Sequence, residues 1–193
     1  MVTELILKGI SKHIHLTDEE TAYFISLLHP KQLTRKQFLL KEGEICKYSA
    51  FVVSGCLRGY TVDENGQEHV MNFAPVGWWI ADMYSLISQR PGTLYIEAPE
   101  PAEVLLLSKV KQELLFQEVP KFERFFRIIT ENSLVAHQQR LMDNLSLPAE
   151  ERYNNFCKRY PSLINGLPKK DIASYIGVTP EFFSRMMSKM LRG

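Results

Sequence analysis

The stretch KKDIASYIGVTPEFFSRMMS, residues 169–188, contains the pattern that decides the fold. Two short helices that cross at a steep angle need a small residue at their contact. They also need a turn residue able to adopt positive φ, and apolar residues at fixed offsets. Ala173 fills the contact position and Gly177 the turn. The apolar positions are filled by Ile172, Ile176, Val178, Phe183 and Met186. The stretch therefore predicts a helix-turn-helix motif.

The second predicted helix has its own start signals. Thr179 suits the N-cap, and Pro180 suits the first helical position. A carboxylate in the first turn interacts favourably with the helix dipole. Its polar face combines Arg, Ser and Glu, as reading of the DNA major groove requires. A plain helical hairpin with a solvated charged face is the alternative. As DNA contacts we predict Lys169, Lys170, Thr179, Glu181, Phe182, Ser184, Arg185 and Lys189.

The charge distribution supports a separate polyanion-binding module. Residues 146–193 carry eight Lys or Arg against four Asp or Glu, although the net charge of all 193 residues is +1. A basic C-terminal quarter on a slightly acidic body is typical of a nucleic-acid-binding module joined to another domain. No apolar run is long enough to cross a membrane, and the N-terminus lacks a signal peptide. We therefore expect a cytoplasmic protein with no membrane partner.

The central part of the chain predicts strands. Between Gln37 and Ser108, short segments rich in β-branched and aromatic residues alternate with turn signals, of which Asn65-Gly66 is a strong hairpin signal. This spacing indicates a small antiparallel barrel or sandwich. Before it, Thr17-Asp18-Glu19-Glu20 has the form of a capping box and predicts a helix that His29-Pro30 ends. The predicted strands are Ser49–Val53, Leu57–Val62, His69–Phe73, Thr93–Ala98 and Glu103–Ser108.

A long helix follows the strands. Residues 120–145 contain no Gly and no Pro after Pro120, and they follow a short predicted helix, Lys109–Gln117. Three shorter helices, 148–160, 168–175 and 179–191, complete the chain. The long helix either packs on its own barrel or buries an apolar stripe against the same helix of a second subunit. We favour the second arrangement. The stripe is Phe122, Phe125, Phe126, Ile129, Val135, Ala136, Leu141 and Leu145.

The whole chain resembles the Crp/Fnr family. The resemblance rests on residues 41–44 and 51–58 (KEGE and FVVSGCLR), on GQE and PVGWWI at 66–68 and 75–80, and on the DIA, GVTPE and SR elements at 171–185. It implies an α+β fold: a jelly-roll-like sensor β-roll over 1–118, a dimerisation helix over 119–145 and a helix-turn-helix domain over 146–193. It also implies base reading by Glu181 and Arg185. The implied partners are double-stranded DNA, a second copy of the chain and RNA polymerase.

The phosphate cassette departs from the pattern of cAMP-binding relatives. Ala81 and Asp82 stand where the family has Gly and Glu, and Gly92 stands where it has Arg. Arg90 comes two residues too early. Without the guanidinium a cyclic phosphate loses its bidentate partner, so we expect no cAMP binding. A less charged effector is the alternative. Its pocket would be lined by Trp78, Trp79, Ala81, Asp82, Met83, Tyr84, Arg90 and Thr93.

Other functions find less support in the sequence. Three scattered cysteines and five histidines make no metal site or disulfide framework, and we identify no cofactor. Catalytic motifs are absent, so we expect no enzyme. Since the sequence ends at Gly193, we expect no β-hairpin wing after the recognition helix. The rival function is a ligand-binding β-roll whose vestigial helix-turn-helix serves protein contacts.

Overall fold

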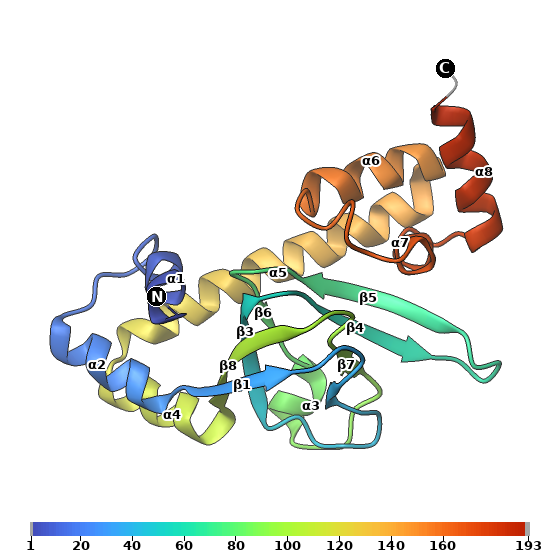
Figure 1. Cartoon of the computed structure of the whole chain (residues 1–193). Helices are drawn as coiled ribbons and strands as arrows, with labels where there is room; N and C mark the ends of the chain where they lie inside the picture. Colours follow the sequence, from blue (N-terminus) through green and yellow to red (C-terminus); the bar gives the residue numbers. More distant parts are fainter. Residues whose placement is uncertain (1, 192–193) are drawn as a thin grey trace. The chain divides into compact units, whose positions relative to one another are not determined.

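The computed structural model describes residues 2–191 and has an α+β fold (Figure 1). The strands are β1 (His29–Leu33), β2 (Phe38–Leu40), β3 (Tyr48–Ser54), β4 (Leu57–Val62), β5 (Glu68–Ala74), β6 (Trp79–Ile80), β7 (Tyr95–Glu97) and β8 (Ala102–Ser108). The helices are α1 (Val2–Ile10), α2 (Asp18–Leu27), α3 (Met83–Ser88), α4 (Lys109–Glu118), α5 (Lys121–Ser146), α6 (Ala149–Arg159), α7 (Lys169–Tyr175) and α8 (Pro180–Met190).

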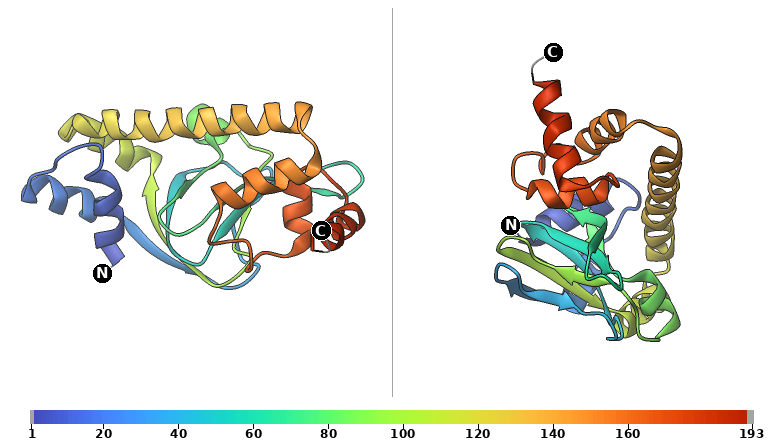
Figure 2. Two further views of the ribbon diagram at one scale, coloured as in Figure 1. Left: turned by 90° about the horizontal axis from the view of Figure 1, so that it is seen from above. Right: turned by 90° about the vertical axis from the view of Figure 1, so that its right-hand side faces the viewer.

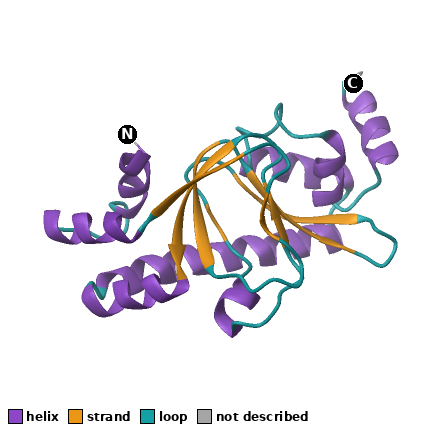
Figure 3. Ribbon diagram, turned by 60° about the horizontal axis from the view of Figure 1, so that its bottom comes forward, coloured by secondary structure: helices purple, strands orange, loops and turns teal. Residues whose placement is uncertain are grey.

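The strands form two four-stranded sheets, shown in orange in Figure 3. One sheet has the order β1-β8-β3-β6 and the other the order β2-β7-β4-β5. The pairs β1–β8, β3–β8, β3–β6 and β2–β7 are antiparallel. The fold class and the antiparallel roll expected from the turn spacing are confirmed.

Both faces of the β3–β8 pair are buried, because alternate residues face two different cores. Ala50 and Val52 belong to the core inside the roll, whereas Phe51 between them packs with the helices. On β8, Leu106 is in the inner core and Leu105 in the helical one. Helices α1, α2, α4 and the start of α5 supply the rest of the helical core, which gathers at one end of the first compact unit (Figure 2).

Two local predictions at the N-terminal end are confirmed. The capping box is confirmed, since Glu20 N–H donates to Thr17 Oγ1 and Thr17 N–H donates to Glu20 Oε2. The helix ends at Leu27. The prediction that His29-Pro30 ends this helix is also confirmed, and Pro30 itself lies inside β1. Strand β1 is at the sheet edge, where a missing N–H removes no ladder hydrogen bond.

Helix α5 changes character along its length. In its first half, Phe122 and Phe125 are buried, and Phe126 packs edge-on against the rings of Phe116 and Trp79 at 5.5 Å between centroids. The N-terminal part of the predicted stripe therefore packs within the chain, as the first alternative proposed. The second half has exposed apolar side chains instead: Leu134, Val135, Leu141, Met142 and Leu145.

The chain divides into two compact units. The first comprises residues 1–59 and 73–133, and the second residues 60–72 and 134–193. The second unit thus combines the β4–β5 loop region with the C-terminal half of α5 and the helices that follow. The boundaries expected from the sequence, after residues 118 and 145, stay a prediction.

Candidate nucleic-acid interface

The helix-turn-helix wedge is built as the sequence predicts. Ala173 is fully buried where α7 meets α8, and Phe183 and Met186 of α8 are buried with Ile172 and Ile176. Val178 is half-buried, and its N–H donates to the carbonyl of Ala173 at 3.0 Å. Gly177 adopts φ +71°, a conformation that favours glycine because a Cβ would be strained there. The two helices are thereby fixed in the crossed arrangement.

Helix α8 begins with the expected cap. Thr179 Oγ1 accepts from the N–H of Phe182 at 3.2 Å, and Pro180 is the first helical residue. The face of α8 away from the wedge is polar and exposed, and Phe182 is also largely exposed. This face can therefore meet a partner without unpacking the core. Its exposed polar residues are Glu181, Ser184, Arg185, Ser188 and Lys189.

The two predicted phosphate contacts at the start of α7 differ in their surroundings. Both Lys169 and Lys170 are exposed. Lys170 Nζ lies 3.6 Å from Glu68 Oε2, within the second compact unit. An exposed ion pair of this kind contributes little, typically up to about 1 kcal/mol, so a DNA phosphate could replace Glu68 at small cost.

Arg140 of α5 is a structural residue that the sequence analysis missed. Its guanidinium donates to the carbonyls of Val70 at 2.7 Å, of Tyr175 at 2.8 Å and of Met71, and it lies 4.0 Å from the centre of the Tyr175 ring. Ser174 joins the same region, since its Oγ donates to Glu68 O and accepts from Val70 N–H, both at 2.9 Å. Arg140 and Ser174 thus tie α5, α7 and the strand β5 together.

Burial and charge shift the acid–base behaviour around this cluster. Burial lowers the pKa of Arg140, although the guanidinium remains a cation. Burial, and then the charges of Arg140 and Arg159, lower the pKa of His137. Burial raises the pKa of the Tyr175 hydroxyl. The positive charges on this side of α5 therefore disfavour protonation of His137.

In the roll, the residues of the degenerate cassette bind one another. Asp82 caps α3 by accepting the N–H of Ser85 at 3.0 Å. Ser85 Oγ donates to the carbonyl of Arg90 at 2.6 Å and accepts the N–H of Cys46 at 2.8 Å. Gly92 packs so closely here that an added Cβ would collide with the Asp82 carboxylate. A side chain at position 92 does not fit this arrangement.

A buried cation of the roll already has a carboxylate partner. Arg58 on β4 and Glu97 on β7 are both buried, with Arg58 Nη2 3.3 Å from Glu97 Oε2. Apolar side chains from both sheets surround the inside of the roll. A cyclic phosphate could bind Arg58 only by displacing Glu97. Because both residues are buried, breaking this ion pair would cost considerable free energy.

The other predicted pocket residues do not share one environment. Trp78 and Ala81 pack against the core inside the roll, whereas Trp79 packs against the helical core. Met83 and Tyr84 are exposed on α3. Arg90 and Thr93 are exposed in the loop that follows α3. Trp78 and Trp79 therefore cannot line one cavity together, although they are neighbours in the sequence.

Within residues 2–191, no group of three or more His, Cys, Asp or Glu side chains could hold a metal ion. No helix in the same range is long and apolar enough to cross a membrane.

Comparisons with known folds agree with this architecture. Residues 30–118 match the cyclic nucleotide-binding domain family. FixK2 from Bradyrhizobium japonicum is similar in structure with a TM-score of 0.75 at 21% identity, over 86% of this chain and 85% of that one. The c-di-GMP responsive regulator CLP of Xanthomonas campestris gives a TM-score of 0.70 at 15% identity, over 91% and 92% of the two chains.

Curated relatives are regulatory proteins. The anaerobic regulatory protein of Haemophilus influenzae is 24% identical over 170 residues, which are 82% of this chain and 65% of the relative. Regulatory protein HlyX of Actinobacillus pleuropneumoniae is 20% identical over 90% of this chain and 77% of its own length. This chain thus spans about two thirds of the first relative. With a match to the cyclic nucleotide-binding domain over residues 30–118, a helix-turn-helix later in the sequence and regulatory proteins as relatives, the chain is similar to regulators of the Crp/Fnr type.

Proposed function

We propose that this protein is a cytoplasmic, sequence-specific DNA-binding transcriptional regulator that reads the major groove with α8. The observation that carries the proposal is the division of α8 into two faces. Phe183 and Met186 are buried in the wedge, while Glu181, Ser184 and Arg185 are exposed near the helix N-terminus. Residues at this end of a recognition helix are the ones that reach base edges.

The exposed residues have different roles in this proposal. Arg185, one turn after Glu181, donates two hydrogen bonds to O6 and N7 of a guanine. Lys169, at the start of α7, binds a backbone phosphate and carries no sequence information. Lys170 does the same after it leaves Glu68.

A homodimer completes the DNA-binding unit. Leu141 is 61% exposed and Leu145 80% exposed on the second half of α5, and they lie one turn apart. Burial of such side chains against the same helix of a second copy removes apolar surface from water. The dimer then presents two recognition helices to half-sites one turn of DNA apart.

The effector of the roll is, in our proposal, something other than a cyclic nucleotide. Support comes from Gly92, where a side chain would collide with Asp82, and from the pairing of Arg58 with Glu97. Calorimetry of the whole protein with cAMP and with cGMP tests this part. We expect no heat of binding. A micromolar dissociation constant for either nucleotide would contradict it.

Two matched variants test the role of α8. Arg185→Ala should weaken binding to a selected operator by about 10- to 100-fold and relax the preference at one base pair. Lys169→Ala should weaken all sequences alike and reduce the slope of log affinity against log salt by about 1. Equal losses on operator and random DNA for Arg185→Ala would show a phosphate contact. No sequence preference in the unmodified protein would favour the rival function, a roll with a vestigial helix-turn-helix.

A further inference from the structure

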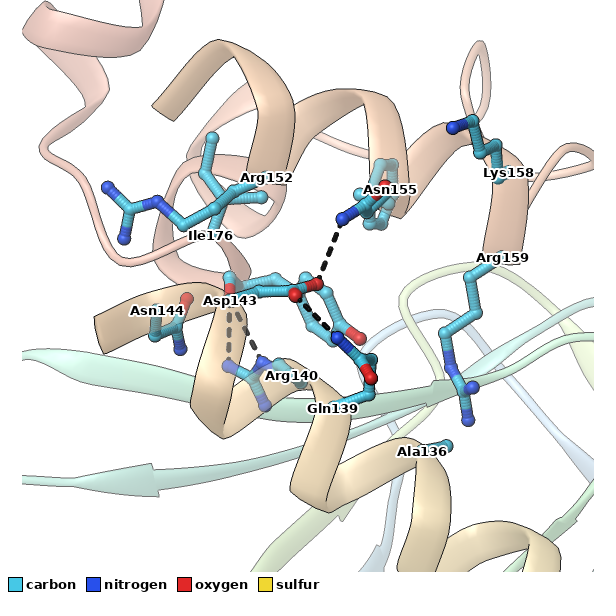
Figure 4. Close-up of a pocket in the computed structure, with 12 residues that line it drawn as sticks. Ala136, Gln139, Arg140, Asp143, Asn144, Arg152, Asn155, Lys158, Arg159 and Ile176 are labelled. Atoms are coloured by element: carbon cyan, nitrogen blue, oxygen red, sulfur yellow. Dashed lines mark hydrogen bonds between the residues drawn. The ribbon is translucent and has the colours of Figure 1, made fainter. Parts of the chain in front are cut away.

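A basic cavity lies within the second compact unit, apart from the face of α8. Its volume is about 440 Å³, and its walls come from the C-terminal half of α5, from α6 and from the end of α7 (Figure 4). Because no residue of α8 lines it, the cavity is distinct from the proposed base-reading face. All of its lining residues belong to residues 134–193.

Positive charge predominates in its lining. Arg140, Arg152, Lys158 and Arg159 line the cavity, and Asp143 is the carboxylate among the lining residues. Both oxygens of Asp143 are already bound by neutral amides. Asp143 Oδ1 accepts from Gln139 Nε2 at 2.9 Å, and Oδ2 from Asn155 Nδ2 at 3.0 Å. In Figure 4 the guanidinium groups of Arg152 and Arg159 lie on opposite sides of that carboxylate.

Arg152 has an unused donor. Its Nε is buried and has no hydrogen-bond partner. A buried donor without an acceptor is costly, and few such groups persist in folded proteins without a reason. The Arg152 guanidinium also lies beside the turn of the helix-turn-helix, since a Cβ built on Gly177 would be 3.2 Å from Arg152 Nη1.

We propose that this cavity binds a small phosphate-bearing anion, with Arg152 as its principal ligand. The anion would accept hydrogen bonds from the terminal nitrogens of the Arg152 guanidinium and would offset the excess positive charge of the lining. A guanidinium fork suits a phosphate, which accepts charge-assisted hydrogen bonds. A small molecule fits a concave site of this volume. The site does not depend on the DNA-binding proposal.

The test uses the full-length protein with inorganic pyrophosphate as the probe. Calorimetry and thermal melting are run at constant ionic strength, with sodium chloride replacing pyrophosphate in the reference. We expect saturable binding and a rise in melting temperature, because the anion binds the folded state. Arg152→Gln should weaken binding by about 10- to 100-fold. The matched control Arg35→Gln, at an exposed position in the first compact unit, should bind like the unmodified protein.

The melting temperature without ligand separates binding from a structural role. Arg152→Gln should melt at the same temperature as the unmodified protein or higher, because it removes an unsatisfied buried donor. A lower melting temperature with undiminished pyrophosphate binding would overturn the proposal. The exposed Lys158→Gln is the second variant; it removes a charge from the rim and should weaken binding less than Arg152→Gln does. Unchanged binding in Arg152→Gln would overturn the proposal.

Two further outcomes would also contradict it. If chloride at equal ionic strength stabilises the protein as much as pyrophosphate, the effect is general screening and the cavity is not a specific site. If Arg152→Gln weakens random duplex DNA as strongly as pyrophosphate, the lining cations are DNA backbone contacts.

Discussion

Replacement of Arg140 by Met should strongly destabilise the second compact unit. The guanidinium donates to three carbonyls, those of Val70, Met71 and Tyr175, and it stacks on the Tyr175 ring. A hydrogen bond from a charged donor contributes about 1.5–3 kcal/mol, and water can replace part of it at a half-buried site, so we take about 1 kcal/mol for each carbonyl. Stacking adds about 0.5–1 kcal/mol. The expected loss is therefore about 3.5–4 kcal/mol, a large part of a typical stability.

The assay is urea unfolding followed by circular dichroism, with operator binding measured in parallel. Arg124→Met is the control, because Arg124 is an exposed arginine on the same helix. The control should stay within about 0.5 kcal/mol of the unmodified protein, as surface substitutions usually do. If Arg140→Met unfolds at the same urea concentration as the control, the hydrogen bonds to β5 and α7 do not stabilise the unit, and our reasoning about Arg140 is wrong.

Three further outcomes are expected. Leu141→Glu with Leu145→Glu should yield monomers in sedimentation, since both side chains are exposed in a single chain; an unchanged dimer would place the interface elsewhere. Burial, followed by the charge of Glu100, raises the pKa of Cys56 to about 12, so at pH 8 its thiol stays protonated. Iodoacetamide should then label the partly exposed Cys157 and spare Cys56 until urea is added, as mass spectrometry would show. Gly92→Ala should cost about 1–3 kcal/mol in urea unfolding because its methyl group collides with Asp82; no loss would mean that the loop relaxes freely.

The helical elements with strong local signals could be predicted from the sequence. The capping residues Thr17 and Thr179 fix helix starts through hydrogen bonds to residues three positions away. The helix-turn-helix was predictable for a similar reason. The motif requires a small residue where its helices touch and a turn residue with positive φ, and Ala173 and Gly177 meet these two requirements. Strand β4 was predicted at its exact bounds, Leu57–Val62. In each of these cases the cause lies within a few residues.

The missed features depend on distant parts of the chain. Strand β1 contains Pro30, which a sheet edge tolerates, and the position of the edge follows from the topology. Helix α3 is not evident from the sequence, because Asp82, its N-cap, also stands at a position of the phosphate cassette. The contacts of Arg140 with Val70 join residues 70 positions apart. The sequence could supply the residues of the basic cavity but not the fact that α5 and α6 bring them together.

The central claim is that α8 reads base sequence, and the specificity ratio measures it most directly. Sites are selected from random duplexes, and the affinity of the protein for the best site and for its scrambled form is then measured by fluorescence anisotropy at several salt concentrations. We predict a ratio of about 10³ or more that persists when the salt-dependent part of binding is removed. A ratio near one at every salt concentration would mean that the protein binds only the phosphate backbone, and it would contradict the account.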